Sequence, residues 1–447
     1  MNKVSAPVND FVRNYKNSGT LRFQMPGHKG TEFHGCEALD ITEIKGADYL
    51  YDASGIIGES EAQTAKAFGA GMTLYSTEGS SQCIKAMLGI IALETGIKHP
   101  KVLAPRNVHK AFIDACILLD LEVLWLYPNR PSTSVCCCDI TPQQIETALA
   151  EHSDISCCYV TSPDYLGNIA DIPRIAEICH SKSVPLLVDN AHGAYTAFLE
   201  ENTHPIALGA DMCCDSAHKT LPCYTGTAYL HISKNAPKEF SEKAKRVMSM
   251  FGSTSPSYLL LQSLDLCSHM LCTAKLPPMI KNAAVRTAVC KSMLEQQGWK
   301  LAGSEKLKIT IFAAKCGYTG TDLADLLRHR HIEPEYCDLE FLVLMTGVTH
   351  TKEDFDCLVN ALGEIPVLQP LELDLPTVTP CERKMTMRAA AFCKSQAVPV
   401  TQTVGRTCAL TVTACQPSVP VIVSGEVIDA SAVKLLQASG ITTVNVI

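Results

Sequence analysis

Short apolar runs alternate with helical segments from about Glu59 to Ile232, and this rhythm limits the fold more than any other feature of the sequence. The runs are rich in Val, Leu, Ile, Tyr and Cys, and a few turn residues separate each run from the next helical segment. Parallel strands need a crossover connection, which a helix usually supplies. The sequence therefore predicts an α/β fold built on a mostly parallel sheet. The expected strands are Val102–Ala104, Glu122–Tyr127, Ser156–Thr161, Pro185–Asp189, Met212–Asp215 and Thr227–Ile232.

The helical segments have clear start signals and one-sided apolar faces. Thr141 precedes a proline and is followed three residues later by Gln144, which is the pattern of a capping box. Ile84, Met87 and Leu88 repeat with the spacing of a buried helix face. Helices of this kind are expected to pack against the sheet.

A second, smaller α/β unit is expected after a helix that runs from about Ser257 to Leu271. Val367–Pro380, farther along the chain, is rich in proline and is typical of a linker. The smaller unit alternates strand, helix, strand and helix, at Leu307–Ala313, Gly320–His329, Glu340–Thr346 and Lys352–Leu362, the last capped by Thr351. We therefore expect an N-terminal arm (1–40), a large domain (41–275), a small α/β domain (276–366), and a linker with a C-terminal α+β domain (367–447).

Composition narrows the class of protein. The chain has 447 residues, of which 47% are hydrophobic and 19% charged, so it can bury a large core and is not a disordered protein. Its 38 basic and 46 acidic residues give a net charge of −8, which argues against nucleic acid or an anionic membrane as a partner. No signal-peptide pattern and no unbroken apolar run of membrane-spanning length is present. We expect a cytoplasmic protein.

The 22 cysteines are the unusual part of the composition. Three are contiguous at Cys136–Cys138, and doublets occur at Cys157–Cys158 and Cys213–Cys214. Contiguous cysteines alternate across a strand and do not readily pair with each other. A metal- or thiol-binding protein is the alternative from another class, but it needs spaced ligand pairs of the Cys-x-x-Cys kind, which the sequence lacks. We expect reduced thiols that fill strands, and no metal.

Polar side chains gather where two of the expected strands end. Asp189 and His192 follow the first strand, and Ser216, His218 and Lys219 follow the second. In open parallel sheets ligands bind outside the carboxyl ends of the strands, so both groups are expected to face one crevice. A lysine beside a histidine and a hydroxyl group in such a crevice is a candidate for covalent chemistry with a carbonyl compound.

Two further elements suit the same crevice. Ser80 and Ser81 follow Gly79 at the start of a predicted helix, and free N–H groups with the helix dipole favour a phosphate there. Serine and glycine are also ordinary helix caps, so this signal alone is weak. His109 follows the strand Val102–Ala104, where its ring could stack on a planar cofactor or could be purely structural.

The order of these groups along the chain, from the turn at Ser80 through His109 and Asp189 to Lys219, resembles that of the fold-type-I pyridoxal-phosphate enzymes. More narrowly, it resembles that of the bacterial ornithine/lysine/arginine decarboxylase family. The resemblance spans nearly the whole chain and implies a large cofactor domain like that of aspartate aminotransferase, a small α/β domain and a C-terminal α+β domain. Five stretches carry the narrower resemblance: Met25–Gly30, Arg106–Lys110, Asp189–Gly193, Ser253–Tyr258 and the tail Pro417–Glu426, which includes Val419–Glu426.

The resemblance also implies a role for each site residue. Lys219 would hold pyridoxal 5′-phosphate covalently, and Asp189 would pair with the pyridine nitrogen, which keeps the ring an electron sink. Ala191 and His109 would lie on opposite ring faces, with His192 near the ring hydroxyl. The phosphate would be held by His218 and by the hydroxyl groups of Ser80, Ser81 and Ser216. Ser253 or Thr254 would reach it from a second subunit.

Two departures from the family concern the C-terminal part and the assembly. Thr386–Ala390 stands where the family usually has Ser-Pro-Arg-Glu-Ala, so the acid of that stretch is missing. The chain also lacks the N-terminal wing domain of the large inducible members. We therefore expect a homodimer or a dimer of dimers.

The expected reaction is decarboxylation of arginine, lysine or ornithine to the corresponding amine of polyamine metabolism, with arginine slightly preferred. The distal cation of such a substrate needs an acid, for which Glu426 is the candidate, although it could equally be a solvated turn residue. The alternative within enzymes is another fold-type-I reaction, by an aminotransferase, an aldolase or a cysteine desulfurase.

Overall fold

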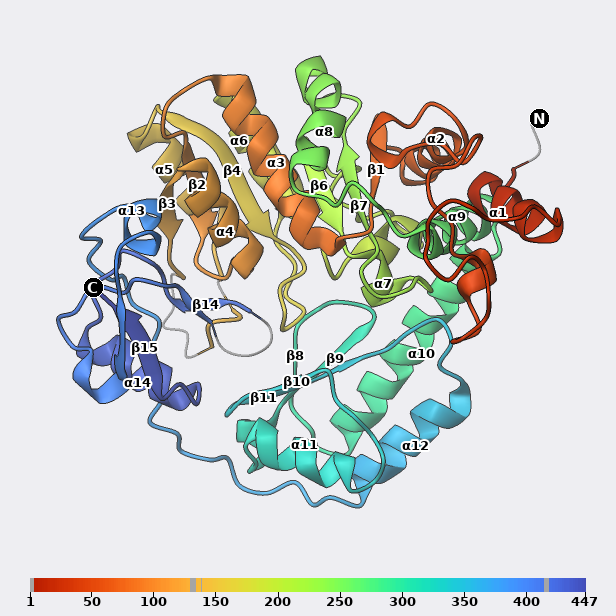
Figure 1. The fold of residues 1–447 in the computed structure, drawn as a ribbon. Coiled ribbons are helices and arrows are strands. Elements are labelled where there is room, and N and C mark those ends of the chain that lie inside the picture. The colour runs from red at the N-terminus through yellow and green to blue at the C-terminus, as the bar shows by residue number, and fades with distance from the viewer. Residues whose placement is uncertain (1–3, 129–133, 138, 414–417) are drawn as a thin grey trace. The chain divides into compact units, whose positions relative to one another are not determined.

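The computed structural model describes residues 4–128, 134–137, 139–413 and 418–447 (Figure 1). The chain divides into two compact units, each built from two separate segments. The first unit comprises 1–96 and 185–281, and the second comprises 97–184 and 282–447. The four-part domain division expected from the sequence remains a prediction.

The main sheet has seven strands in the order β1-β7-β6-β5-β4-β2-β3. The pairs β2–β3, β2–β4 and β5–β6 are parallel, whereas β7 is antiparallel to both of its neighbours. The expected α/β class with a mostly parallel sheet is thereby confirmed. The strands are β1 (Met72–Ser76), β2 (Lys101–Pro105), β3 (Glu122–Leu126), β4 (Ile155–Thr161), β5 (Leu186–Asp189), β6 (Met212–Asp215) and β7 (Ala228–Ile232).

Six of these strands agree with the sequence prediction to within two residues at each end, and β1 was not predicted. It is an edge strand that, among the residues the structure describes, pairs only with β7, from Met72 opposite Ile232 to Ser76 opposite Ala228. Its five residues include Thr73, Leu74 and Tyr75, a short β-type run that the prediction omits.

Helices of the first unit pack on one another and on its strands. The long helix α3 contacts α8, β7 and β6, while α2 packs against α9 (Figure 1). A Cβ atom at Gly89 would lie only 2.7 Å from Val247 Cγ1, so the close approach of α3 and α8 depends on that glycine. The helices of this unit are α1 (Pro7–Asn17), α2 (Ile56–Phe68), α3 (Gly79–Thr95), α7 (Ala217–Thr220), α8 (Lys238–Met250) and α9 (Tyr258–Cys272); α10 (Leu276–Gln296) begins here and continues into the second unit.

The second unit contains β4, β2 and β3, a separate four-stranded sheet, and two strand pairs near the C-terminus. The capping box predicted at Thr141 is present, and the predicted cap Thr351 also forms a capping box, with Asp354. Its helices are α4 (Lys110–Leu119), α5 (Pro142–Glu151), α6 (Ile172–Ser181), α11 (Gly320–Arg328), α12 (Lys352–Gly363), α13 (Met387–Ala391) and α14 (Ala430–Ala438). Its remaining strands are β8 (Leu301–Ala302), β9 (Lys308–Phe312), β10 (Tyr336–Cys337), β11 (Phe341–Met345), β12 (Gln396–Pro399), β13 (Val412–Thr413), β14 (Pro420–Ile422) and β15 (Thr443–Val446).

Every cysteine within the described residues is a free thiol, and most are buried. Cys157, Cys213 and Cys214 lie inside strands and are completely buried. Burial raises the pKa of each of these thiols well above its ordinary value, so they remain protonated and pack as small apolar groups. Cys138 of the contiguous run lies outside the described residues. Among the described residues, no helix combines the length and the apolar character needed to cross a bilayer.

Glu61 on α2 is a buried acid whose protonation should make stability depend on pH. Its Oε1 accepts a hydrogen bond of 2.9 Å from the backbone N–H of Tyr75 on the edge strand β1. Burial raises the pKa of Glu61 to about 8. The folded state therefore binds a proton that the unfolded state has released above a pH of about 4.5. Stability should fall as pH rises from about 5 to 8, at roughly 1.4 kcal/mol for each unit of pH.

Urea unfolding midpoints of the wild type and Glu61→Gln at pH 6 and pH 8.5 test this. We expect the wild type to lose stability at the higher pH and Glu61→Gln to lose much less. Glu59→Gln, an exposed acid on the same helix, is the matched control and should behave like the wild type. An equal pH dependence in all three proteins contradicts the prediction.

Candidate active site

The two polar groups predicted from the sequence meet at Lys219 and His192. Lys219 lies in the short helix α7 after β6, and its backbone N–H donates to the carbonyl of Ser216 at 3.1 Å. His192 lies in the turn after β5 and is only 5% exposed. The Nζ atom of Lys219 is 3.0 Å from Nε2 of His192. The candidate covalent lysine therefore has an imidazole within hydrogen-bonding distance.

Asp189 is a buried carboxylate at the last position of β5, and it is 2% exposed. Its Oδ1 atom accepts a hydrogen bond of 3.1 Å from the backbone N–H of Ala191 and one of 3.6 Å from the thiol of Cys214. Asp189 and Cys214 are in register across the parallel pair β5–β6. An acceptor held in this way at a strand end is suited to a protonated ring nitrogen.

The predicted anion-binding turn is the N-terminus of α3, a helix of 17 residues. Gly79 begins it with a φ of 71°, and its N–H donates to the carbonyl of Gly226 at 2.7 Å. Ser80 and Ser81 lie in the first helical turn and are half-buried. Two hydroxyl groups at the positive end of a long helix are a chemically suitable set of donors for a phosphate.

The remaining phosphate candidates lie in the same unit. Ser216 is buried directly before α7, and His218 is half-buried within α7. Ser253 and Thr254 are exposed in the loop after α8, where Ser253 Oγ accepts a hydrogen bond from the N–H of Ser255. Their exposure in the single chain is compatible with the role expected for them, contact across a subunit boundary.

His109 belongs to the second unit and caps α4. Its Nδ1 atom accepts a hydrogen bond of 3.1 Å from the N–H of Ala111, and the ring is half-buried. The cap fixes the position of the ring at the helix N-terminus. Stacking of this ring on the cofactor remains a prediction.

Glu426, the substrate candidate, also belongs to the second unit and forms a buried ion pair. Its Oε2 atom is 3.0 Å from Nη2 of Arg106 and accepts a hydrogen bond of 2.7 Å from the N–H of Val423. The two charged side chains are 4% and 5% exposed. The carboxylate expected to receive a substrate cation thus already has a cation of the protein beside it. Its role in substrate binding remains a prediction.

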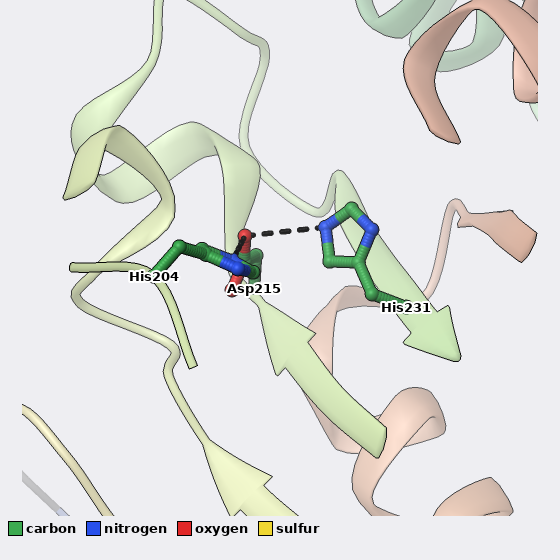
Figure 2. Close-up of side chains that lie close together, drawn as sticks. All are labelled: His204, Asp215 and His231. Carbon is green, nitrogen blue, oxygen red and sulfur yellow. Dashed lines mark hydrogen bonds and ion pairs between the residues drawn. The ribbon is translucent and has the colours of Figure 1, made fainter. Parts of the chain in front are cut away.

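One polar cluster of the first unit was not predicted from the sequence. His204, Asp215 and His231 are completely buried, and both imidazoles make hydrogen bonds to the carboxylate (Figure 2). The distances to Asp215 Oδ2 are 2.9 Å from His204 Nε2 and 3.2 Å from His231 Nε2. Each residue lies in or beside an apolar run, and a polar residue inside such a run is the signal that could have marked the cluster.

Comparison with known proteins decides the family. The model of a family described as "Orn/Lys/Arg decarboxylase, major domain" matches residues 6–313. The chain belongs to the Orn/Lys/Arg decarboxylase family. The arginine decarboxylase of Halalkalibacterium halodurans is 30% identical, over 92% of this chain and 88% of the relative. The arginine decarboxylase of Bacillus subtilis (strain 168) is 28% identical, over 96% of this chain and 92% of the relative.

Solved structures confirm the fold of this decarboxylase. The lysine decarboxylase of Francisella novicida superimposes with a TM-score of 0.82 at 16% identity, over 100% of this chain and 82% of that one. The constitutive lysine decarboxylase of Escherichia coli gives a TM-score of 0.79 at 18% identity, over 99% and 82%. The protein is accordingly an amino-acid decarboxylase, a carboxy-lyase of a family that depends on pyridoxal 5′-phosphate. The alternative of a protein built around metal or thiol ligands is wrong.

The ion pair of Arg106 and Glu426 predicts a large stability effect. Glu426→Gln removes the negative charge and leaves the buried guanidinium without it, which typically costs about 3–5 kcal/mol. The urea midpoint should fall, and Arg106→Met combined with Glu426→Gln should recover part of the loss. Asp356→Asn breaks the exposed pair with Lys352 and should cost about 0.5 kcal/mol at most. If Glu426→Gln leaves stability unchanged and only raises KM, its main role is to bind substrate.

Proposed function

We propose that this decarboxylase acts on a basic amino acid, with arginine preferred over lysine and ornithine. The main support for this proposal is that relatives named arginine decarboxylase match this protein over nearly the full length of both chains. The products would be carbon dioxide and agmatine, or the matching diamine from lysine or ornithine. We further propose that the reaction takes place in the cytoplasm and supplies polyamine synthesis; the free thiols of the described residues suit a reducing compartment.

The proposed reaction breaks the bond between Cα and the carboxylate. The electron pair stays on Cα, carbon dioxide leaves, and a proton takes the place of the carboxylate. Bound pyridoxal phosphate supplies the conjugated ring that withdraws this electron pair. The protein must hold the ring, keep its nitrogen protonated and orient the carboxylate.

We assign these tasks to residues of the first unit, and one further contact with the ring to His109 of the second unit. Lys219 holds the cofactor covalently, with His192 at 3.0 Å as the group that can exchange a proton with its amine. Asp189 holds the proton of the pyridine nitrogen, because its buried carboxylate is an acceptor at the strand end. Ala191 lies against the ring, with His109 assigned to its other face and His192 near its hydroxyl. The phosphate is held at the N-terminus of α3 and by α7, through Ser80, Ser81, Ser216 and His218.

Product analysis tests the proposed function. Purified enzyme loaded with pyridoxal phosphate is incubated separately with arginine, lysine and ornithine. We expect carbon dioxide and agmatine from arginine, with a kcat/KM at least about tenfold above the other two, which is 1.4 kcal/mol of discrimination. Lys219→Ala should lose both the visible absorbance of the bound cofactor and the activity.

Lys234→Ala, which changes an exposed lysine of the same unit, is the control and should keep both properties. Release of a keto acid in place of carbon dioxide would overturn the decarboxylase assignment in favour of transamination. Preference for lysine or ornithine would overturn only the choice of arginine.

We also propose that the enzyme is a homodimer, alone or paired into a dimer of dimers, in which the N-terminal arm contacts the second copy. Large apolar side chains of the arm are strongly exposed in the single chain: Leu21 81%, Phe23 92%, Met25 62% and Phe33 73%. Clustered exposure of this kind is typical of an interface. Ser253 and Thr254, the residues expected to reach a second subunit, are exposed as well.

The molar mass in solution tests the dimer. Light scattering after size exclusion should give at least twice the 48.4 kDa of one chain. Phe23→Ser combined with Phe33→Ser should shift the protein toward monomer at micromolar concentration. Phe392→Ser changes a residue that is 68% exposed elsewhere on the chain and should leave the mass unchanged. A wild type that is monomeric at all concentrations would refute the proposal.

A further inference from the structure

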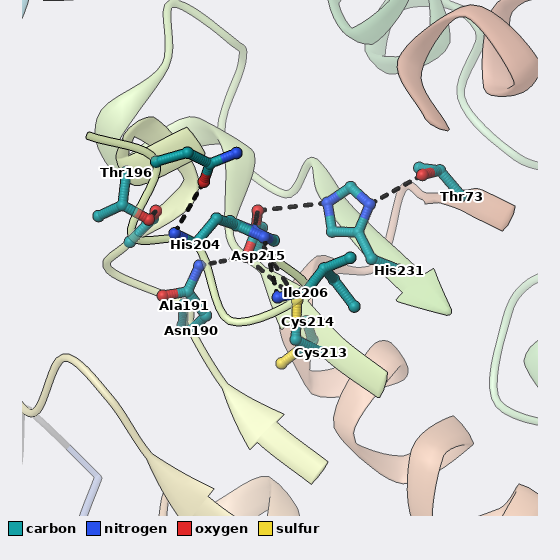
Figure 3. A network of polar contacts seen from close by, with 12 residues as sticks. Thr73, Asn190, Ala191, Thr196, His204, Ile206, Cys213, Cys214, Asp215 and His231 are labelled. Carbon is teal, nitrogen blue, oxygen red and sulfur yellow. Dashed lines mark hydrogen bonds and ion pairs between the residues drawn. The ribbon is translucent and has the colours of Figure 1, made fainter. Parts of the chain in front are cut away.

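Figure 3 shows the buried cluster of His204, Asp215 and His231 with its polar neighbours. Strand register places the side chains of Asp215 and His231 on the face of the main sheet opposite to that of Asp189. Asp189 is in register with Cys214, so these two side chains share one face. Asp215 follows Cys214 and points to the other face, as does Cys213, which is in register with His231. The cluster therefore supports the end of β6 from the side away from Asp189.

Asp215 carries a negative charge although it is completely buried. Burial alone would raise its pKa, but the interactions with His204 and His231, each at hydrogen-bonding distance, hold the pKa of Asp215 well below its ordinary value. Its Oδ1 atom accepts a third hydrogen bond, of 2.7 Å, from Nδ2 of Asn190. Burial lowers the pKa of His231, so this ring is neutral at neutral pH. Other titratable groups that face Asp215 are the thiols of Cys83 and Cys213, and burial raises the pKa of both.

The proton positions favour a hydrogen-bonded carboxylate over a metal site. A backbone N–H can only donate, and that of Ile206 donates to Nδ1 of His204 at 3.3 Å. In the neutral ring Nδ1 is then unprotonated, and the proton on Nε2 is donated to Asp215. A histidine that binds a metal through Nε2 has the opposite arrangement, because its Nδ1–H donates to an acceptor. His204 is thus fixed as a donor to the carboxylate.

The third partner, Asn190, connects the cluster to the active site. Asn190 lies between Asp189 and Ala191, its backbone N–H donates to the carbonyl of Cys214 at 3.0 Å, and its carbonyl accepts from the N–H of Gly193 at 2.7 Å. Its side chain is bound to Asp215, which directly precedes Ser216. One carboxylate therefore ties the turn that carries His192 to the segment that carries Lys219.

We propose that Asp215, kept charged by His204 and His231, is a positioning residue that sets the separation of Lys219 and His192 and stabilises positive charge at Lys219. This inference rests on the proposed role of Lys219. Its physical basis is that a buried negative charge lowers the free energy of a cation on the same segment, and Lys219 follows Asp215 by four positions. A carboxylate with three nitrogen donors also holds both turns more rigidly than neutral hydrogen bonds would.

Asp215→Asn tests the proposal with little change in size. The new amide must direct its N–H₂ group toward Asn190 or toward the histidines, and Asn190 and His204 are already donors. At least one hydrogen bond is lost, together with the charge. His204→Gln is the conservative variant, because its side-chain amide can still donate to Asp215. Asp211→Asn is the matched control: it removes a buried carboxylate directly before β6, where Asp211 Oδ2 accepts from the N–H of Leu186 at 2.8 Å.

The visible absorbance of the cofactor bound to Lys219 is measured against pH, alongside kcat, KM and the urea midpoint. In Asp215→Asn we expect the pH midpoint of the absorbance change to shift downward. We also expect kcat to fall about 10- to 100-fold, with little change in KM. This is the loss of activity that is typical when a residue that holds a functional group in place is replaced. His204→Gln should lie close to the wild type. Asp211→Asn should lower the urea midpoint without shifting the absorbance. If Asp215→Asn behaves like Asp211→Asn, the role of Asp215 is only structural and the proposal is wrong.

A second measurement uses the protein without cofactor or substrate. In ¹⁵N-histidine NMR spectra, the ring signals that disappear in His204→Gln should show a protonated Nε2 and an unprotonated Nδ1, unchanged by added Zn²⁺ or by EDTA. Loss of the Nε2 proton on adding Zn²⁺ would overturn the proposal in favour of a metal site. This readout does not depend on which amino acid is the substrate. A wrong assignment of the reaction can therefore be distinguished from a wrong assignment of the hydrogen bonds around Asp215.

Discussion

The candidate active site depends on the parallel pairing of β5 with β6. In this register Leu187 lies opposite Met212 and Asp189 opposite Cys214, so both strands reach the same edge of the sheet within one residue of each other. The turns that follow carry His192 and Lys219, whose side-chain nitrogens are 3.0 Å apart. A slip of one residue would reverse the face of every side chain on one strand and separate these groups. The buried, continuous strands make such a slip costly, since all four residues of each strand are buried.

Features governed by local chemistry were predictable from the sequence. The strands that end in Asp189 and Asp215 are identified by their apolar runs. The capping box at Thr141 needs only four consecutive residues, which the local sequence shows directly. The location of Lys219 and His192 at strand ends follows from these runs and from the rule that parallel strands present their carboxyl ends together. The grouping of the site therefore needed only the assumption that the two strands belong to one sheet.

Features governed by distant partners were not predictable. The hydrogen bond between Arg106 and Glu426 joins residues separated by 320 positions. A single sequence shows that Glu426 is charged but does not show which cation lies beside it. A glutamate that pairs with Arg106 and a glutamate that binds the substrate cation therefore look the same in the sequence. The cluster around Asp215 was not predictable for the same reason, because its partners come from other segments: His204 lies in a loop and His231 in a neighbouring strand.

Two buried carboxylates of the first unit show how the fold controls the charge of buried groups. Glu61 and Asp215 are both almost completely removed from water, yet burial raises the pKa of Glu61 to about 8 while the pKa of Asp215 lies well below its ordinary value. Burial is common to both, so the donors must make the difference. Within the described residues Glu61 accepts one hydrogen bond, from Tyr75 N–H, whereas Asp215 accepts from two imidazoles and an amide. The fold therefore leaves the carboxyl group on α2 neutral at neutral pH and keeps a negative charge at the end of β6, four positions before Lys219 in the chain.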